Sequence, residues 1–235
     1  MGKKSPTNVK HVNDLVENLN EVSKLLFFHE QIGGTGKGNK SFVNVLNKSA
    51  VVLLVACWEA FVEDVAQEAF DSMLKHAEDY KSFTVKVRNL ASADLLNPAK
   101  KDQIWDLAGN GWKDVLKNHR DKILEKNTGN FNTAKAARVD NLFEDLIGLR
   151  HLSTEWHWQG MPMHQAVTRL DSLVSLRGDI AHRVRPNRSV LKGELEESIN
   201  FIQILAAKTS NRVAVHVKSR TGVSPWDGVS FRNKK

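Results

Sequence analysis

Arg177 and His182 stand five residues apart, and together they carry the side chains needed for acid–base chemistry on a phosphodiester without a metal ion. An imidazole titrates near neutral pH and exchanges protons with a reacting group, while a guanidinium binds phosphate oxygens through paired hydrogen bonds. On a helix this spacing places the two side chains about 140° apart. We therefore expect them to line a groove where their helix meets a second one.

Glu59 is a third residue that could take part in this chemistry, because it follows Trp58 inside a strongly apolar segment. A buried carboxylate needs a partner or has a raised pKa. Arg177 or His182 would serve as that partner. The other interpretation is that Glu59 marks the point where its helix reaches solvent.

Basic residues gather directly after the Arg/His pair. The chain has a net charge of +7, and residues 183–192 contain four basic residues and no acidic one. A positive strip of this kind is what binding to a phosphate backbone requires, whereas the alternative is a solvated helix end and loop. The four residues are Arg183, Arg185, Arg188 and Lys192.

Apolar residues recur every three or four positions along most of the chain, which predicts helices and few strands. Long helices are expected at about 8–30, 41–78, 135–149, 163–184 and 189–220, with shorter ones near 98–108 and 112–126. The segment around residues 51–58 is apolar on most sides, so its helix must lie at the centre of a bundle or in a subunit interface.

These elements predict an all-α protein, an up-and-down helical bundle with two long core helices and an inserted middle of shorter helices. We expect one domain over residues 1–220, with an irregular insertion at about 80–132, followed by a basic and flexible tail at 221–235.

The composition favours a soluble cytoplasmic protein. Cys57 is the only cysteine, so no intrachain disulfide can form, and its apolar neighbours favour a buried, unreactive thiol. The N-terminus lacks the apolar run of a signal peptide, and no apolar stretch approaches the roughly 18 residues of a spanning helix. No membrane contact is expected.

Two further patterns give little support to phosphate binding by a glycine-rich loop or to metal binding by histidines. The glycine-rich segment 33–38 lacks the Lys-Ser/Thr spacing of a phosphate-binding loop and follows a helix, so a connection between helices is expected. His151, His157 and His164 are six and seven residues apart, which matches no zinc pattern. Neither a metal nor another cofactor is predicted.

The segment Leu176–His182, Leu-Arg-Gly-Asp-Ile-Ala-His, resembles the signature of the HEPN superfamily, helical bundles whose nuclease members carry Arg-x4-6-His. Segments 58–61, 129–132 and 142–149 are similar to the RiboL-PSP HEPN subgroup, and the resemblance spans about residues 10–210. It implies a homodimer in which two copies of the motif helix form one composite cleft.

The resemblance also implies metal-independent attack of an RNA 2′-hydroxyl on the adjacent phosphate. His182 would act as general acid or base and Arg177 would stabilise the phosphate, while the basic strip would position the RNA backbone. Related proteins often have a polar residue directly after the arginine, where this chain has Gly178. Asp179 is the neighbouring candidate for that auxiliary role, or it pairs along the helix surface.

We therefore expect an endoribonuclease in prokaryotic antiphage defence or a toxin–antitoxin stress response, with RNA, a second copy and an antitoxin or regulatory protein as partners. The alternative is a non-catalytic HEPN module that binds RNA or a protein. A helical scaffold without any nucleic-acid role is a third hypothesis.

Overall fold

The computed structural model describes residues 9–33, 40–96, 98–128, 134–183 and 189–231. Over these residues it contains seven α-helices and no β-strand, which confirms the all-α prediction. The helices are α1 (Lys10–Gly33), α2 (Lys40–His76), α3 (Val85–Ser92), α4 (Gly111–Thr128), α5 (Ala136–Ile147), α6 (Met163–Arg183) and α7 (Lys192–Thr221).

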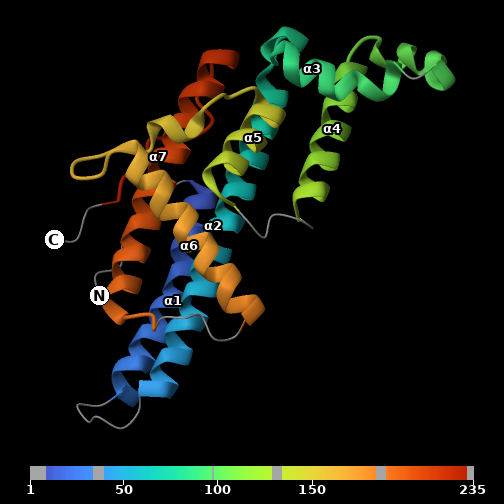
Figure 1. Cartoon of the computed structure of the whole chain (residues 1–235). Coiled ribbons are helices and arrows are strands. Elements are labelled where there is room, and N and C mark those ends of the chain that lie inside the picture. The colour runs from blue at the N-terminus through green and yellow to red at the C-terminus, as the bar shows by residue number, and fades with distance from the viewer. Residues whose placement is uncertain (1–8, 34–39, 97, 129–133, 184–188, 232–235) are drawn as a thin grey trace.

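Helices α1 and α2 form an antiparallel hairpin along the length of the bundle (Figure 1). The stripe of α1 predicted from periodicity is buried against α2, and it includes Leu15, Leu19 and Val22. Helix α2 is long and apolar enough by composition to cross a membrane, but half of its most apolar window is buried inside the fold. Its apolar sides are therefore largely used by neighbouring helices.

Three helices cover α2 from other directions, because α5, α6 and α7 all pack against it. Amphipathic α5 buries Val139, Phe143 and Leu146. It ends at Gly148 in the left-handed conformation, with φ 75°, where a Cβ would collide with Thr84. Only glycine satisfies both conditions without strain, so the end of α5 is fixed at this residue.

The middle of the chain projects from the bundle (Figure 1). Helix α3 lies in the segment expected to be irregular, and Thr84 caps its N-terminus by accepting a hydrogen bond from the Val87 amide. The short helix predicted near 98–108 is a 3-10 helix over Pro98–Leu107. The long helices begin and end within three residues of their predicted limits, because their apolar stripes are long enough to define them.

The segment after α7, expected to be flexible, packs against the bundle as far as Phe231. Gly222 ends α7 in the left-handed conformation. Asn211 then binds both backbone groups of Val229, donating to its carbonyl at 2.7 Å and accepting from its amide at 2.7 Å. The side chain of Val229 is buried with Val9 and Val12 of the N-terminal region.

Candidate functional site

Arg177 lies where α6 crosses α2. One turn earlier, Leu173 and Val174 are buried and hold α6 on the bundle. The side chain of Arg177 is 17% exposed, and its Nη2 lies 3.9 Å from Oε2 of Glu59 on α2. Of the two partners that the sequence allowed for Glu59, the structure therefore places the arginine beside it.

The environment of Glu59 is unfavourable for a negative charge. Its side chain is only 13% exposed, and within the described residues its Oε1 is buried without a hydrogen-bond partner. Burial raises the pKa of Glu59, while Arg177 and the backbone of Ala134 act in the opposite direction. Ala134 is itself tied to α2, because its carbonyl accepts a 3.0 Å hydrogen bond from the indole of Trp58. Glu59 thus combines an incompletely compensated charge with a nearby cation.

His182 lies apart from this pair, in the last turn of α6, and its side chain is exposed. Within the described part of the chain, no hydrogen bond or ion pair engages its imidazole. Asp179 is also exposed. Arg177 and His182 thus differ in burial within one protomer.

Only part of the basic strip lies within the described structure. Arg185 and Arg188 lie outside the described residues, as does the side chain of Arg183. Lys192 begins α7, and its Nζ lies 3.4 Å from Oε1 of Glu196, one turn along the helix. Lys192 therefore already has an acidic neighbour in the free protein.

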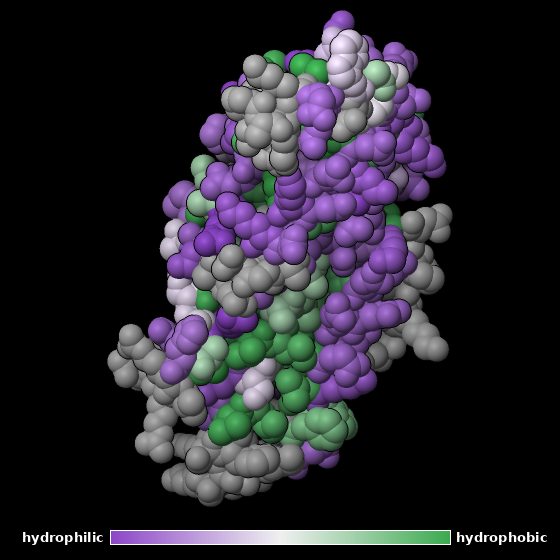
Figure 2. All heavy atoms as spheres, turned by 90° about the vertical axis from the view of Figure 1, so that its right-hand side faces the viewer, coloured by the Kyte–Doolittle hydropathy of each residue, from purple (hydrophilic) through white to green (hydrophobic). Residues whose placement is uncertain are grey.

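An open groove of about 440 Å³ separates the N-terminal half of α2 from the end of α6. Figure 2 shows apolar surface gathered in the lower part of this face of the molecule. Val45, which lines the groove, is 57% exposed. The groove is lined by Val45, Lys48, Ser49, Val52, Leu53, Ala56 and Ile180. An apolar surface therefore lies beside the motif helix.

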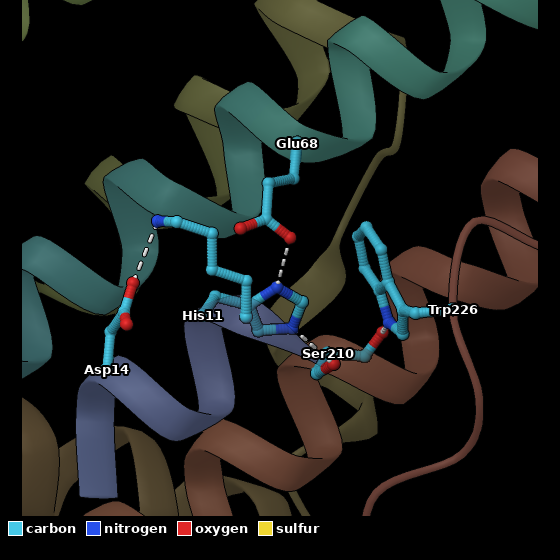
Figure 3. A network of polar contacts seen from close by, with 6 residues as sticks. His11, Asp14, Glu68, Ser210 and Trp226 are labelled. Carbon is cyan, nitrogen blue, oxygen red and sulfur yellow. Dashed lines mark hydrogen bonds and ion pairs between the residues drawn. The ribbon is translucent and has the colours of Figure 1, made fainter. Parts of the chain in front are cut away.

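A second histidine site was not recognised from the sequence. His11 on α1 is fully buried, with its Nδ1 2.7 Å from Oε2 of Glu68 and its Nε2 2.9 Å from Oγ of Ser210 (Figure 3). The ring of Trp226 packs edge-on against it at 4.6 Å between centroids. The sequence did contain a sign that His11 is buried, since this residue falls on the apolar stripe of α1, four residues before Leu15. Three helices and the C-terminal segment meet at this imidazole.

The order serine, histidine, carboxylate in this cluster matches that of a hydrolase triad, but its setting does not suit nucleophilic attack. Ser210 is fully buried in the interior of α7, and Trp226 donates a 3.3 Å hydrogen bond to the carbonyl of the same residue. A substrate carbonyl would need open space beside the hydroxyl and free amide donors for its oxygen. The cluster is therefore a structural junction.

Two asparagines on α2 form another contact that sequence patterns did not reveal. Asn44 accepts a 3.2 Å hydrogen bond from the amide of Val190, and Asn47 donates a 2.7 Å hydrogen bond to the carbonyl of Val190. Asn47 is 3% exposed and Val190 is 4% exposed. The position of Asn47 within an apolar helix could have indicated such a contact from the sequence, because a buried side-chain amide requires a hydrogen-bond partner. We call this contact the asparagine clamp.

The sequence also offered three histidines and Cys57 as residues that could carry chemistry. His151, His157 and His164 are all exposed, and among the described residues no three His, Cys, Asp or Glu side chains are grouped so that they could hold a metal ion. Cys57 is buried, and burial raises the pKa of its thiol to about 11. Its thiol is therefore protonated at neutral pH.

The fold and site together define an all-α domain of the HEPN type, with Arg177 and His182 on a late helix that packs against a long central one. A model of the RiboL-PSP-HEPN family matches residues 13–214, and the chain belongs to that family. Comparisons with curated proteins and with solved structures found no match. Membership of this family indicates a nuclease or an RNA-binding module.

Proposed function

We propose that this protein is a metal-independent endoribonuclease that works as a homodimer. The observation that carries the proposal is the contrast along α6. Arg177 is held beside a carboxylate of α2, whereas His182, five residues later, is exposed in the last helical turn. A cation of fixed position and an accessible imidazole are the two groups that cleavage of RNA by its own 2′-hydroxyl requires.

In the proposed reaction, His182 accepts the proton of the 2′-hydroxyl as its oxygen attacks the adjacent phosphorus. The bond from phosphorus to the 5′-oxygen breaks, leaving a 2′,3′-cyclic phosphate and a 5′-hydroxyl that takes up a proton from a second acid. Arg177 stabilises the negative charge that develops on the phosphoryl oxygens. Glu59 acts as a positioning residue for Arg177, and Asp179 is an auxiliary candidate on the exposed surface of α6.

Two copies supply what one protomer lacks. Five helical residues turn the chain by about 140°, so Arg177 and His182 of one copy do not share a face. His182 of a second copy would provide the missing proton-transfer group. The apolar groove beside α6 supports this arrangement, because exposed apolar surface next to polar residues is typical of protein interfaces.

The basic strip of Arg183, Arg185, Arg188 and Lys192 is proposed to bind the RNA backbone. A role in cytoplasmic antiphage defence or in a toxin–antitoxin system, with a partner that restrains the nuclease, extends the proposal by analogy with other HEPN proteins.

The test is cleavage of an oligoribonucleotide in EDTA by the wild type, by His182→Ala and by His164→Ala. His164 is a matched control, because it is an exposed histidine at the other end of α6. We expect His182→Ala to slow cleavage at least 100-fold, in line with the loss of a general acid or base. His164→Ala should retain the wild-type rate, and 2′-O-methylation of the RNA should abolish cleavage.

Equal rates for the two histidine variants would contradict the catalytic assignment. Salt-sensitive RNA binding without any turnover, unaffected by His182→Ala, would instead identify a non-catalytic RNA-binding module.

A further inference from the structure

The backbone that enters α5 is bound by both α2 and α6, the helices that meet at the candidate site. The indole of Trp58 on α2 donates a 3.0 Å hydrogen bond to the carbonyl of Ala134. The amide of Ala136 donates a 2.9 Å hydrogen bond to Oδ1 of Asp171 on α6. Ala134 and Ala136 are both buried. The start of α5 therefore connects α2 to α6.

Helix α5 depends on the contact with α6 because its own residues do not cap it. The N-cap residue Lys135 makes no side-chain cap hydrogen bond, and the first turn contains no acidic residue. The first amides of a helix have no partner within the helix, and the N-terminus of a helix favours a negative charge. The carboxylate of Asp171 meets both needs from a neighbouring helix, so the position of α6 is tied to the start of α5.

The Arg177–Glu59 pair is not held together by such a short bond. Nη2 of Arg177 lies 3.9 Å from Oε2 of Glu59, which is beyond the range of a hydrogen bond. The separation of the two charges therefore depends on how α6 lies against α2. Six residues separate Asp171 from Arg177, which corresponds to about 9 Å along the helix axis and about 120° around it. The two side chains thus leave α6 in different directions, one toward α5 and the other toward α2.

Two kinds of contact between Asp171 and Arg177 determine how α6 is oriented. Leu173 and Val174 are buried and pack α6 against the bundle, but apolar burial is non-directional. A hydrogen bond has a preferred distance and angle, so the bond from Ala136 to Asp171 limits rotation of α6 about its axis more sharply than the apolar packing does. Rotation of α6 would change the distance between the guanidinium and its carboxylate partner.

We propose that Asp171 is a positioning residue for Arg177. By accepting the hydrogen bond from Ala136, it fixes the rotation of α6 and keeps the guanidinium beside Glu59. The expected effect of Asp171 on cleavage rests on the proposed function, whereas its effect on the Arg177–Glu59 pair does not require any activity.

The first experiment measures the ionisation of Glu59, which responds to the distance of the guanidinium. Burial and the charge of Glu63 raise the pKa of Glu59, whereas Arg177 and the backbone of Ala134 lower it. Titration is followed by NMR of glutamate isotopically labelled at the side-chain carboxyl carbon, with Glu59→Gln identifying the signal. Asp171→Ala should let Arg177 move away and should raise the pKa of Glu59 further.

Asp171→Asn separates the hydrogen bond from the charge, because it keeps an oxygen acceptor for the Ala136 amide. Loss of the aspartate charge alone cannot raise the pKa of Glu59, because a nearby negative charge raises the pKa of a carboxyl group. A rise in Asp171→Ala that is absent in Asp171→Asn therefore reports the movement of Arg177. Ser175→Ala is a matched control on α6, since Ser175 is exposed and its hydroxyl donates to the carbonyl of Asp171 within the same helix.

If Asp171→Ala does not fold, Asp171→Glu provides the same test. It retains the charge but displaces the acceptor by one methylene group, so the pKa of Glu59 should again rise.

The second experiment measures RNA cleavage by the same variants. Asp171→Ala should lower kcat and kcat/KM by the same factor, about tenfold or more, because a misplaced guanidinium no longer stabilises the transition state. Asp171→Asn should retain most of the wild-type rate. In an Arg177→Ala background, Asp171→Ala should have no further effect, because the effects of residues that act as a unit are not additive.

An unchanged pKa of Glu59 in Asp171→Ala, or an equal rise in Asp171→Asn, would overturn the inference. An equal loss of cleavage from Asp171→Ala with and without Arg177 would also overturn it, because the aspartate would then have only a structural role. If the wild type does not cleave RNA, the proposed function fails, and the titration of Glu59 still decides whether Asp171 positions Arg177.

Discussion

His11 and His182 lie on helices that each contact a carboxylate of α2, yet the environments of the two histidines are opposite. His11 is fully buried, and each ring nitrogen lies within 2.9 Å of a polar partner. His182 is exposed at the end of α6, where no described residue engages its imidazole. The two carboxylates differ in the distance to their partners, because Glu68 lies 2.7 Å from its histidine whereas Glu59 lies 3.9 Å from Arg177. Among the described residues, Oε1 of each is buried without a hydrogen-bond partner.

This difference separates polar groups that stabilise the fold from polar groups left available for a ligand. Buried polar groups with close partners, such as the two ring nitrogens of His11, make a unique packing arrangement more stable than its alternatives. A buried carboxylate without full compensation and an accessible imidazole contribute little to stability, which is the pattern expected at functional sites. The serine and carboxylate around His11 look more like a catalytic triad, but the less complete group on α6 is the better candidate for chemistry.

The largest expected effect on stability comes from His11→Ala. The substitution leaves the buried Ser210 hydroxyl without its partner and creates a cavity between α1, α2 and α7, so we expect a loss of about 3 kcal/mol in the free energy of unfolding. Chemical denaturation measures this loss. RNA cleavage at a temperature where the variant remains folded should be unchanged. A loss below about 1 kcal/mol would show that the cluster is not a structural junction.

A smaller effect, with a pH dependence, is expected for Glu59→Gln. Because burial raises the pKa of Glu59 in the folded protein, the unfolded chain loses this proton first as the pH rises. Folding stability therefore falls between the ordinary glutamate pKa and the raised folded value. The glutamine variant should be more stable than the wild type at neutral pH, and its advantage should disappear in acid.

Denaturant unfolding between pH 4 and pH 8 measures the difference in stability between Glu59→Gln and the wild type. A glutamine variant that is less stable than the wild type at neutral pH would contradict the prediction. Cleavage should slow in the same variant, because Arg177 loses the charge that positions it. Retention of the full rate would remove Glu59 from the proposed site but would leave the stability prediction intact.

The smallest expected effect on stability is that of His182→Ala. The side chain is exposed, so the free energy of unfolding should change by less than about 0.5 kcal/mol. Thermal unfolding of the variant beside the wild type measures this change. A marked destabilisation would mean that His182 has a structural role, and the contrast with His11 would no longer hold.

Much of the fold could be predicted from the sequence, because a long apolar stripe appears as a periodic pattern in consecutive residues. The stripes of α1 and α5 defined both helices. Helix α3 was missed because it is only eight residues long, too short for a periodic pattern to stand out. The candidate site was predicted as a set of residues, but the partner of Glu59 was left open between Arg177 and His182.

The sequence by itself determined the helical bundle, the spacing of Arg177 and His182 and the basic strip after them, since each depends on residues close together in the chain. Only the tertiary structure decided that Glu59 lies beside Arg177, that His11 joins residues 57 and 199 positions away, and that Val190 is bound by α2. Local spacing fixes which face of a helix a residue occupies, but the packing of several helices decides what that face meets.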